Sequence, residues 1–250
     1  MIRFDVLTLF PELFDTVLGE SIIGRAQESG IITVNSINIR DFSLNKHKKV
    51  DDTPYGGGNG MVMTPQPIFD AFNSIKWIKD TKPKTIYMSP QGTVLTQKKA
   101  IELSKEDQLV ILCGHYEGID ERVIEGLIDE EISIGDYVLT GGELPAMVLI
   151  DCISRMVPDV LANEEAFSNE SIYNGMLEYP QYTRPFDYNG MTVPDILISG
   201  HHANIEEWRK MQSLIRTFLK RPDLFNKLEL TEKEIIAIKN CIDKNAIKSI

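Results

Sequence analysis

Short apolar runs alternate with amphipathic stretches through the first half of the chain. The apolar runs lie at residues 1–10, 31–39, 84–89, 108–113 and 131–134. Helical stretches fall between them: one opens at Pro11, and two others cover about 96–104, with Thr96 as N-cap, and 119–127. Buried strands that alternate with helices are typical of parallel sheets with covered faces. The pattern therefore predicts an α/β fold with a mostly parallel sheet.

The second half of the chain is predicted to be mostly helical. An apolar helix is expected from about residue 144 to 156, with Pro145 tolerated in its first turn. Asn204 and Thr231, each with a glutamate three residues on, predict the starts of two further helices. One face of the first is marked by Ile205, Trp208, Gln212, Ile215 and Leu219. We predict a domain at residues 1–160, a polar linker at 161–175 and a small helical domain at 176–250.

Composition narrows the class of protein. The three cysteines, Cys113, Cys152 and Cys241, are far apart and odd in number, which excludes a disulfide framework and favours a reducing compartment. The first residues lack the pattern of a signal peptide, and no apolar run approaches the roughly 20 residues of a membrane span. These features predict a cytoplasmic protein without a membrane partner.

The net charge of −11 argues against a protein that wraps long stretches of nucleic acid. Cations do gather in two places: Arg40 with residues 46–49, and Arg209 and Lys210 with Arg216, Lys220 and Arg221. These clusters are either solvated faces or local contacts to RNA, and the sequence leaves both interpretations open.

Glycine-rich segments carry the candidate chemistry. Three predicted strands run into residues 90–92, 114–118 and 135–142, and residues 43–64 form a further glycine-rich loop. Ligands of parallel sheets bind beyond the carboxyl ends of the strands, and glycine permits close backbone approach or positive φ. Each glycine could instead simply make a turn. Convergence of three segments at one edge weakens that alternative, and the residues leave both interpretations open. The four histidines lack metal-ligand spacing, so no metal site is expected.

Motifs along the whole chain are similar to those of the bacterial tRNA (guanine-N1)-methyltransferases. They lie at residues 9–12 (Leu-Phe-Pro-Glu), 40–42, 50–52, 54–58 (Pro-Tyr-Gly-Gly-Gly), 60–61, 89–92, 113–122 (Cys-Gly-His-Tyr-Glu-Gly-Ile-Asp-Glu-Arg), 133–139, 141–146 (Gly-Gly-Glu-Leu-Pro-Ala) and 182–185. The resemblance runs in register from residue 7 to about 223. Together these motifs are highly specific.

The resemblance implies a deep trefoil knot, which periodicity alone never predicts. It implies methyl transfer from S-adenosylmethionine to N1 of the guanosine 3′ to the tRNA anticodon (position 37), giving 1-methylguanosine. It also implies a homodimer with active sites between subunits, a carboxy-terminal domain that grips the tRNA, and a Mg²⁺ requirement. The implied cofactor-binding residues are Tyr87, Ser89, Pro90, Gly114, Tyr116, Glu117, Gly118, Ile134, Gly135, Asp136, Tyr137, Val138, Leu139, Gly141, Gly142 and Pro145.

Two catalytic residues are implied, Glu170 as general base and Arg155 as the cation that stabilises the guanine O6. The pattern usually has aspartate where Glu170 stands, glycine at Asp159 and Ala162, and in many members arginine at His115. Without the resemblance, Tyr87, Tyr116 and Tyr137 would be interpreted as core-packing residues, and Arg155 as a cation that complements a helix dipole. Two rival functions stay open: a knotted methyltransferase acting on ribosomal RNA, and a non-enzymatic nucleotide- or RNA-binding module.

Overall fold

The computed structural model describes residues 1–161, 170–232, 234–236 and 238–239. The chain divides into two compact units, Met1–Ala162 and Asn163–Ile250, and each is described by itself. Most of the predicted linker at 161–175 and the end of the last predicted helix lie outside the described residues.

The first unit is built on a five-stranded parallel sheet. Its strands are β1 (Ile2–Thr8), β2 (Ile32–Asn38), β5 (Lys84–Val94), β6 (Gln108–Cys113) and β7 (Glu130–Ser133), in the order β2-β1-β6-β5-β7. Every neighbouring pair in this sheet is parallel. The predicted parallel α/β fold is therefore confirmed, and the trefoil knot stays a prediction.

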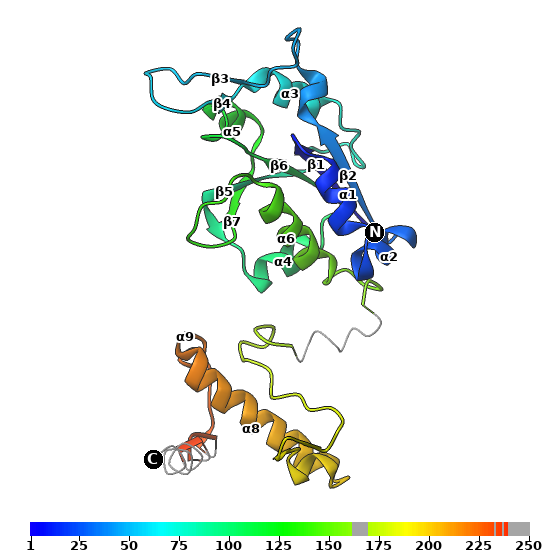
Figure 1. The fold of residues 1–250 in the computed structure, drawn as a ribbon, viewed down its shortest axis with the longest axis vertical. Helices are drawn as coiled ribbons and strands as arrows, with labels where there is room; N and C mark the ends of the chain where they lie inside the picture. Colours follow the sequence, from blue (N-terminus) through cyan, green and yellow to red (C-terminus); the bar gives the residue numbers. More distant parts are fainter. Residues whose placement is uncertain (162–169, 233, 237, 240–250) are drawn as a thin grey trace. The chain divides into compact units, whose positions relative to one another are not determined.

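Helices cover both faces of the sheet (Figure 1). One face packs against α1 (Glu12–Leu18), α2 (Ser21–Glu28), α4 (Gln97–Leu103) and α6 (Glu143–Ser154), and the other against α3 (Pro65–Asn73) and α5 (Glu121–Leu127). Strand β6 shows why the sheet is apolar throughout: Leu109 and Ile111 enter the first core, while Val110 and Leu112 enter the second. All residues of β6 are buried, as expected for a central parallel strand.

The glycine-rich loop at residues 43–64 follows the 3₁₀ turn η1 (Ile39–Phe42) and contains one antiparallel pair, β3 (Asp51–Asp52) and β4 (Val62–Met63). The prediction that this strand ends at Ser89 and runs into a glycine-rich loop at residues 90–92 was wrong, because β5 continues to Val94. The strand slips in register against β7 between Met88 and Thr93. A Cβ at Gly92 would lie 2.3 Å from the carbonyl carbon of Glu131, so this glycine serves the approach of two strands.

Side chains cap the starts of α4 and α5, and the first of these caps was predicted. Thr96 is the N-cap of α4, and its hydroxyl accepts from the backbone N–H of Lys99 at 3.3 Å. The side chain of Asp120 caps α5 in the same way, accepting from the N–H of Arg122 at 3.0 Å. Helix α6 begins at Glu143, one residue earlier than expected, so that Pro145 lies in its first turn.

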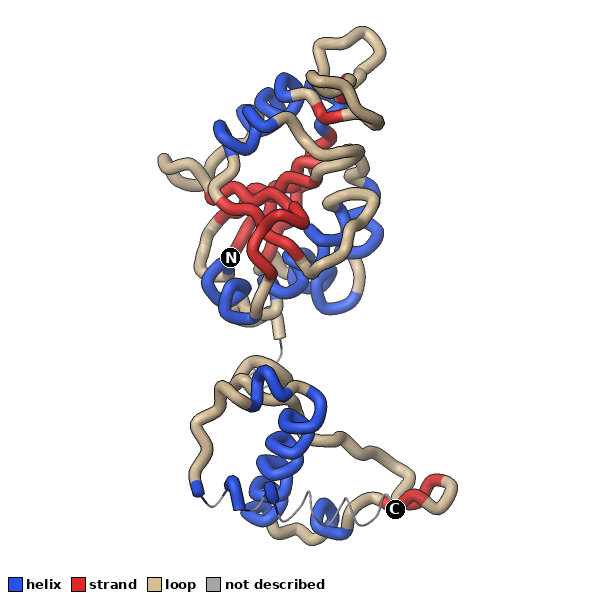
Figure 2. The backbone as a smooth tube through the Cα atoms, turned by 90° about the vertical axis from the view of Figure 1, so that its left-hand side faces the viewer, coloured by secondary structure: helices blue, strands red, loops and turns tan. Residues whose placement is uncertain are grey.

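The second unit contains the hairpin β8 (Asp187–Tyr188) and β9 (Met191–Thr192), the 3₁₀ turn η2 (Asp195–Ile198), α8 (His202–Lys220) and α9 (Pro222–Phe225) (Figure 2). The prediction that Asn204 caps α8 was wrong, since His201 is the N-cap. The Ser199 hydroxyl accepts from the His201 N–H, which lets the helix start earlier.

Two further sequence predictions concern this unit. On the predicted face of α8, Ile205 and Ile215 are buried but Leu219 is exposed. The capping box at Thr231 is confirmed: the Glu234 carboxylate accepts from the Thr231 N–H at 2.8 Å, and the Thr231 hydroxyl accepts from the Glu234 N–H at 3.4 Å. Within the described part of the chain, no helix is long and apolar enough to cross a membrane.

Candidate functional site

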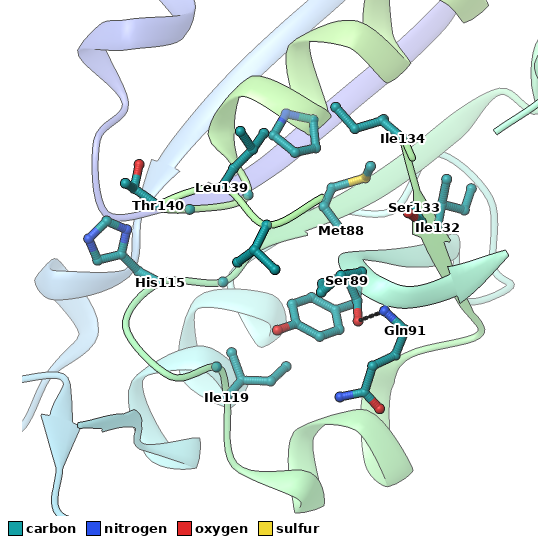
Figure 3. A pocket seen from close by; sticks show the side chains of 18 of the residues that line it. Met88, Ser89, Gln91, His115, Ile119, Ile132, Ser133, Ile134, Leu139 and Thr140 are labelled. Carbon is teal, nitrogen blue, oxygen red and sulfur yellow. Dashed lines mark hydrogen bonds between the residues drawn. The ribbon is translucent and has the colours of Figure 1, made fainter. Parts of the chain in front are cut away.

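A pocket of about 290 Å³ lies at the carboxyl ends of β6 and β7, against the middle of β5 and beside the start of α6 (Figure 3). Its walls come from residues 87–91 of β5, from the end of β7, and from the segments that follow β6 and β7. Among the residues predicted to bind cofactor, it is lined by Tyr87, Ser89, Pro90, Gly114, Tyr116, Glu117, Gly118, Ile134, Gly135, Tyr137, Val138, Leu139, Gly141, Gly142 and Pro145. Asp136 does not belong to the described lining. The structure thus brings together segments that are far apart in the sequence.

The pocket also has lining residues that sequence reasoning missed. They are Met88, Gln91, His115, Ile119, Glu121, Ile124, Ile132, Ser133 and Thr140. The apolar members have the pattern of ordinary core positions, so only their adjacency to the glycine segments could have marked them. Figure 3 shows the Ser89 hydroxyl turned toward the Gln91 backbone, whose N–H it accepts at 3.1 Å. His115 and Thr140 lie together on the opposite side of the same view.

Close backbone contact explains Gly141 and Gly142, which directly precede α6. The N–H of Gly142 donates to the carbonyl of Gly114 at 2.8 Å, and His115 and Gly141 form an isolated antiparallel bridge. A Cβ at Gly142 would lie 2.8 Å from the Cα of Cys113, which leaves no room for a side chain. Positive φ, the other use expected of glycine, occurs in the pocket at Gly118 and Gly135.

The three pocket tyrosines differ in environment. Tyr87 is buried, and desolvation, followed by the nearby Glu131 and Cys113, raises the pKa of its hydroxyl to about 12. Tyr87 therefore packs in the core, as the sequence alone predicts, and also lines the pocket. Tyr116 and Tyr137 are exposed, and core packing does not describe them. Tyr116 has φ +60, a conformation that is rare for a bulky residue and that clusters at functional sites.

The polar loop at residues 43–64 is attached to the pocket wall by backbone hydrogen bonds. The N–H of Glu117 donates to Met61 at 3.0 Å, and the N–H of Met63 donates to Gly118 at 2.9 Å. Gly60, at φ +88, lets the Glu117 side chain pack against it, since a Cβ there would lie 2.4 Å from the Glu117 Oε1. The loop and the pocket therefore form one continuous surface.

Neither of the two predicted catalytic residues is part of the described lining. Arg155 is the C-cap of α6 and does not belong to the described pocket lining. Glu170 belongs to the second unit. Asp159, where the resemblance has glycine, takes φ +69, a left-handed conformation that aspartate tolerates better than most residues. Among the described residues, no three His, Cys, Asp or Glu side chains gather as metal ligands.

A pocket walled by glycine segments at the carboxyl edge of a parallel sheet defines a ligand-binding α/β protein. Residues 2–227 match the family model of tRNA (Guanine-1)-methyltransferase TrmD. The chain therefore belongs to the tRNA (guanine-1)-methyltransferase family, which confirms the family predicted from the motifs.

Curated relatives agree with this family. The chain is 71% identical over 226 residues to the tRNA (guanine-N(1)-)-methyltransferase of Ruminiclostridium cellulolyticum, covering 90% of this chain and 97% of that protein. It is 57% identical over 231 residues to the protein of the same name from Alkaliphilus metalliredigens, covering 92% and 94%. With the Clostridium perfringens strain 13 protein, also of that name, it shares 56% identity over 238 residues, covering 95% and 99%.

Proposed function

We propose that this protein transfers a methyl group from S-adenosylmethionine to N1 of the guanosine 3′ to the anticodon of tRNA, at position 37. The observation that carries the proposal is the extent of the family match, because residues 2–227 include the whole pocket and most of the second unit. The relatives carry the corresponding name. Since its substrate is tRNA, we place the enzyme in the cytoplasm.

The pocket has the features that a methyl donor with an adenosine and an amino-acid part requires. Ile132, Ile134 and Leu139 supply apolar surface for an adenine, and the backbone groups that follow β6 and precede α6 supply hydrogen-bond partners. The absence of a side chain at Gly142 lets the segment before α6 pack against the backbone of Cys113 and Gly114, which brings two of the lining segments together. When bound, S-adenosylmethionine supplies an electrophilic methyl carbon on a sulfonium.

The chain's own residues would act on the guanine. N1 carries a proton and is a poor nucleophile until that proton leaves. We assign its removal to the carboxylate of Glu170, a contribution of roughly 10²–10⁴ in rate for a positioned base. Negative charge then develops on O6, and the Arg155 guanidinium stabilises it. Holding both reactants together supplies much of the remaining acceleration.

We propose a homodimer as the active form. The pocket lies in the first unit and Glu170 in the second, and the resemblance implies that each active site lies between two subunits. Apolar side chains exposed on α1 and α6, which contact each other, support an interface on this face: Leu13, Val17, Leu144 and Val148. Light scattering should give twice the mass of 28.3 kDa. A monomer mass at a concentration that retains full activity would exclude the dimer.

The resemblance also implies Mg²⁺. No cluster of three metal-ligating side chains is present among the described residues, so we derive no step of the reaction through a metal. Titration of Mg²⁺ into the transfer assay measures the requirement directly.

Label transfer from S-adenosylmethionine to defined RNAs tests the function. We expect methylation of an unmodified tRNA with guanosine at position 37 and none of the same tRNA with adenosine there. A ribosomal RNA enzyme would instead label a ribosomal RNA fragment. A binding module would retain tRNA without labelling it.

A further inference from the structure

A buried carboxylate lies directly behind the pocket wall. Glu143, the first residue of α6, is 5% exposed. Its Oε1 accepts a hydrogen bond of 2.9 Å from the hydroxyl of Thr8, which is fully buried at the end of β1. The Thr8 oxygen in turn accepts from the backbone N–H of Phe10 at 3.0 Å. One carboxylate oxygen of Glu143 is thus fixed to the sheet.

The other oxygen of Glu143 faces His115 across Gly141. A Cβ at Gly141 would lie 2.4 Å from Glu143 Oε2 and 2.7 Å from His115 Nδ1, so these two atoms converge on the same point. His115 Nδ1 is buried, and it has no hydrogen-bond partner among the described residues. The imidazole itself is held edge-on by Phe10 and Tyr116, at ring-centroid distances of 5.2 and 4.9 Å.

The buried ring nitrogen of His115 lacks the hydrogen bond that water would give it. A buried polar atom left unpaired is costly, because nothing replaces its lost hydrogen bond to water. The amino-terminal end of α6 stabilises the Glu143 charge in part. A hydrogen bond from His115 Nδ1 to Glu143 Oε2 would give this nitrogen a partner and would hold the second oxygen of the carboxylate.

We propose that His115 Nδ1–H donates to Glu143 Oε2, and that this buried pair is a positioning device for the methyl-donor pocket. The inference rests on the proposed function. The pair connects Thr8 of the sheet to His115 of the pocket wall, and it encloses Gly141, which lines the same pocket. The pair gives Glu143, within motif 141–146, a structural role. Neither binding of S-adenosylmethionine nor the methyl-transfer chemistry assigned a role to this residue.

His115→Phe and His115→Asn form a matched pair of variants. Phenylalanine keeps the ring that packs against Phe10 and Tyr116 but removes the donor, whereas the asparagine amide places a donor near the position of Nδ1. We expect His115→Phe to raise the KM for S-adenosylmethionine and the Kd for S-adenosylhomocysteine about tenfold. The KM for tRNA should stay unchanged, and kcat should change less than twofold. His115→Asn should restore most of the donor affinity.

A double-mutant cycle tests the coupling of the two residues. If they act as one pair, His115→Phe combined with Glu143→Gln should weaken donor binding no more than the worse single variant. Additive losses of donor affinity in the double variant would overturn the proposal. Wild-type donor affinity in His115→Phe would also overturn it, and so would a His115→Asn variant that binds the donor as weakly as His115→Phe. If the Glu143 variant fails to fold, ¹⁵N NMR of the wild-type histidines decides, because the pair requires a protected Nδ1–H resonance.

The proposed function and the pair fail in different ways. A wild-type protein that neither binds S-adenosylhomocysteine in calorimetry nor methylates tRNA would contradict the function itself. A wild-type protein that does both, together with an unimpaired His115→Phe variant, would contradict the pair alone.

Discussion

The backbone N–H of Gly142 donates to the carbonyl oxygen of Gly114 at 2.8 Å, and this bond joins the segment that follows β6 to the segment that opens α6. The adjacent bridge between His115 and Gly141 extends the contact. Part of the pocket wall is therefore formed by two backbone segments in direct contact, with no room for a side chain between them. The most direct test of the pocket is to add one methyl group there.

Gly142→Ala is expected to weaken S-adenosylhomocysteine binding at least about 100-fold while the chain stays folded. The added Cβ would lie 2.8 Å from the Cα of Cys113 and 3.0 Å from the N of Gly114, and backbone atoms cannot move aside cheaply. Gly126→Ala is the matched control, because its Cβ would meet only the tip of the Phe69 ring, 2.9 Å away and outside the pocket. Calorimetry compares the two variants. Wild-type affinity in Gly142→Ala would show that the segments move apart readily.

Glu170→Gln is expected to slow single-turnover methylation by roughly 10²–10⁴, because the amide cannot accept the N1 proton. Binding of S-adenosylhomocysteine should be unaffected, which separates the chemical step from pocket damage. A variant with the wild-type rate would exclude Glu170 as base, and Asp159, Glu164 and Glu165 would be tested next.

Cys113 is expected to resist alkylation in the native protein. It is fully buried, and burial raises the pKa of its thiol well above the usual value, so the reactive thiolate is scarce at neutral pH. Raising the pH to about 8.5, near the pKa of a free cysteine, should leave it unmodified. Peptide mapping after N-ethylmaleimide treatment, with and without urea, measures this. Modification of native Cys113 at the rate of a free thiol would contradict its burial.

Binding of tRNA is expected to show a shallow salt dependence. Several cations of the two clusters are already in ion pairs: Lys48 with Asp41, Arg209 with Glu206, Lys210 with Glu234, and Arg221 with Asp223. Each phosphate contact adds about 0.7–0.9 to the magnitude of the slope of log K on log salt. We expect a slope no steeper than about −5, measured by filter binding from 50 to 300 mM KCl. A slope near −10 would mean that these ion pairs open on RNA.

The parallel sheet could be predicted from the sequence because its strands are buried on both faces. The six residues of β6, for example, are nearly all apolar, and this local pattern alone predicts a strand buried on both faces. The loop expected at residues 90–92 was wrong for a non-local reason. Pro90 and Gly92 are typical of loops, but Gly92 is required by the close approach of the Glu131 backbone on the neighbouring strand.

The candidate site, too, was predictable where its signal is local in the sequence and not where it depends on contacts between distant residues. The glycine segments could be located because glycine is visible in the sequence, and the resemblance supplied the donor that they would bind. The relation between His115 and Glu143 could not be predicted, since their separation in the sequence says nothing of a shared position behind Gly141. The start of α8 was misplaced because Asn204 matches a capping pattern, whereas the N-cap of the helix is His201, which makes no side-chain capping hydrogen bond and therefore leaves no capping signal in the sequence.

The hydrogen bond between Thr8 and Glu143 spans 135 positions of the chain. Thr8 is among the first residues to be synthesised, but its partner leaves the ribosome only after β6, β7 and the intervening helices. A nascent chain that ends before α6 lacks one wall of the pocket and the anchor of that wall. Contacts of such long range form late in folding. The growing polypeptide should therefore acquire affinity for its methyl donor abruptly, near the completion of its first unit, and shorter translation products should not sequester the donor.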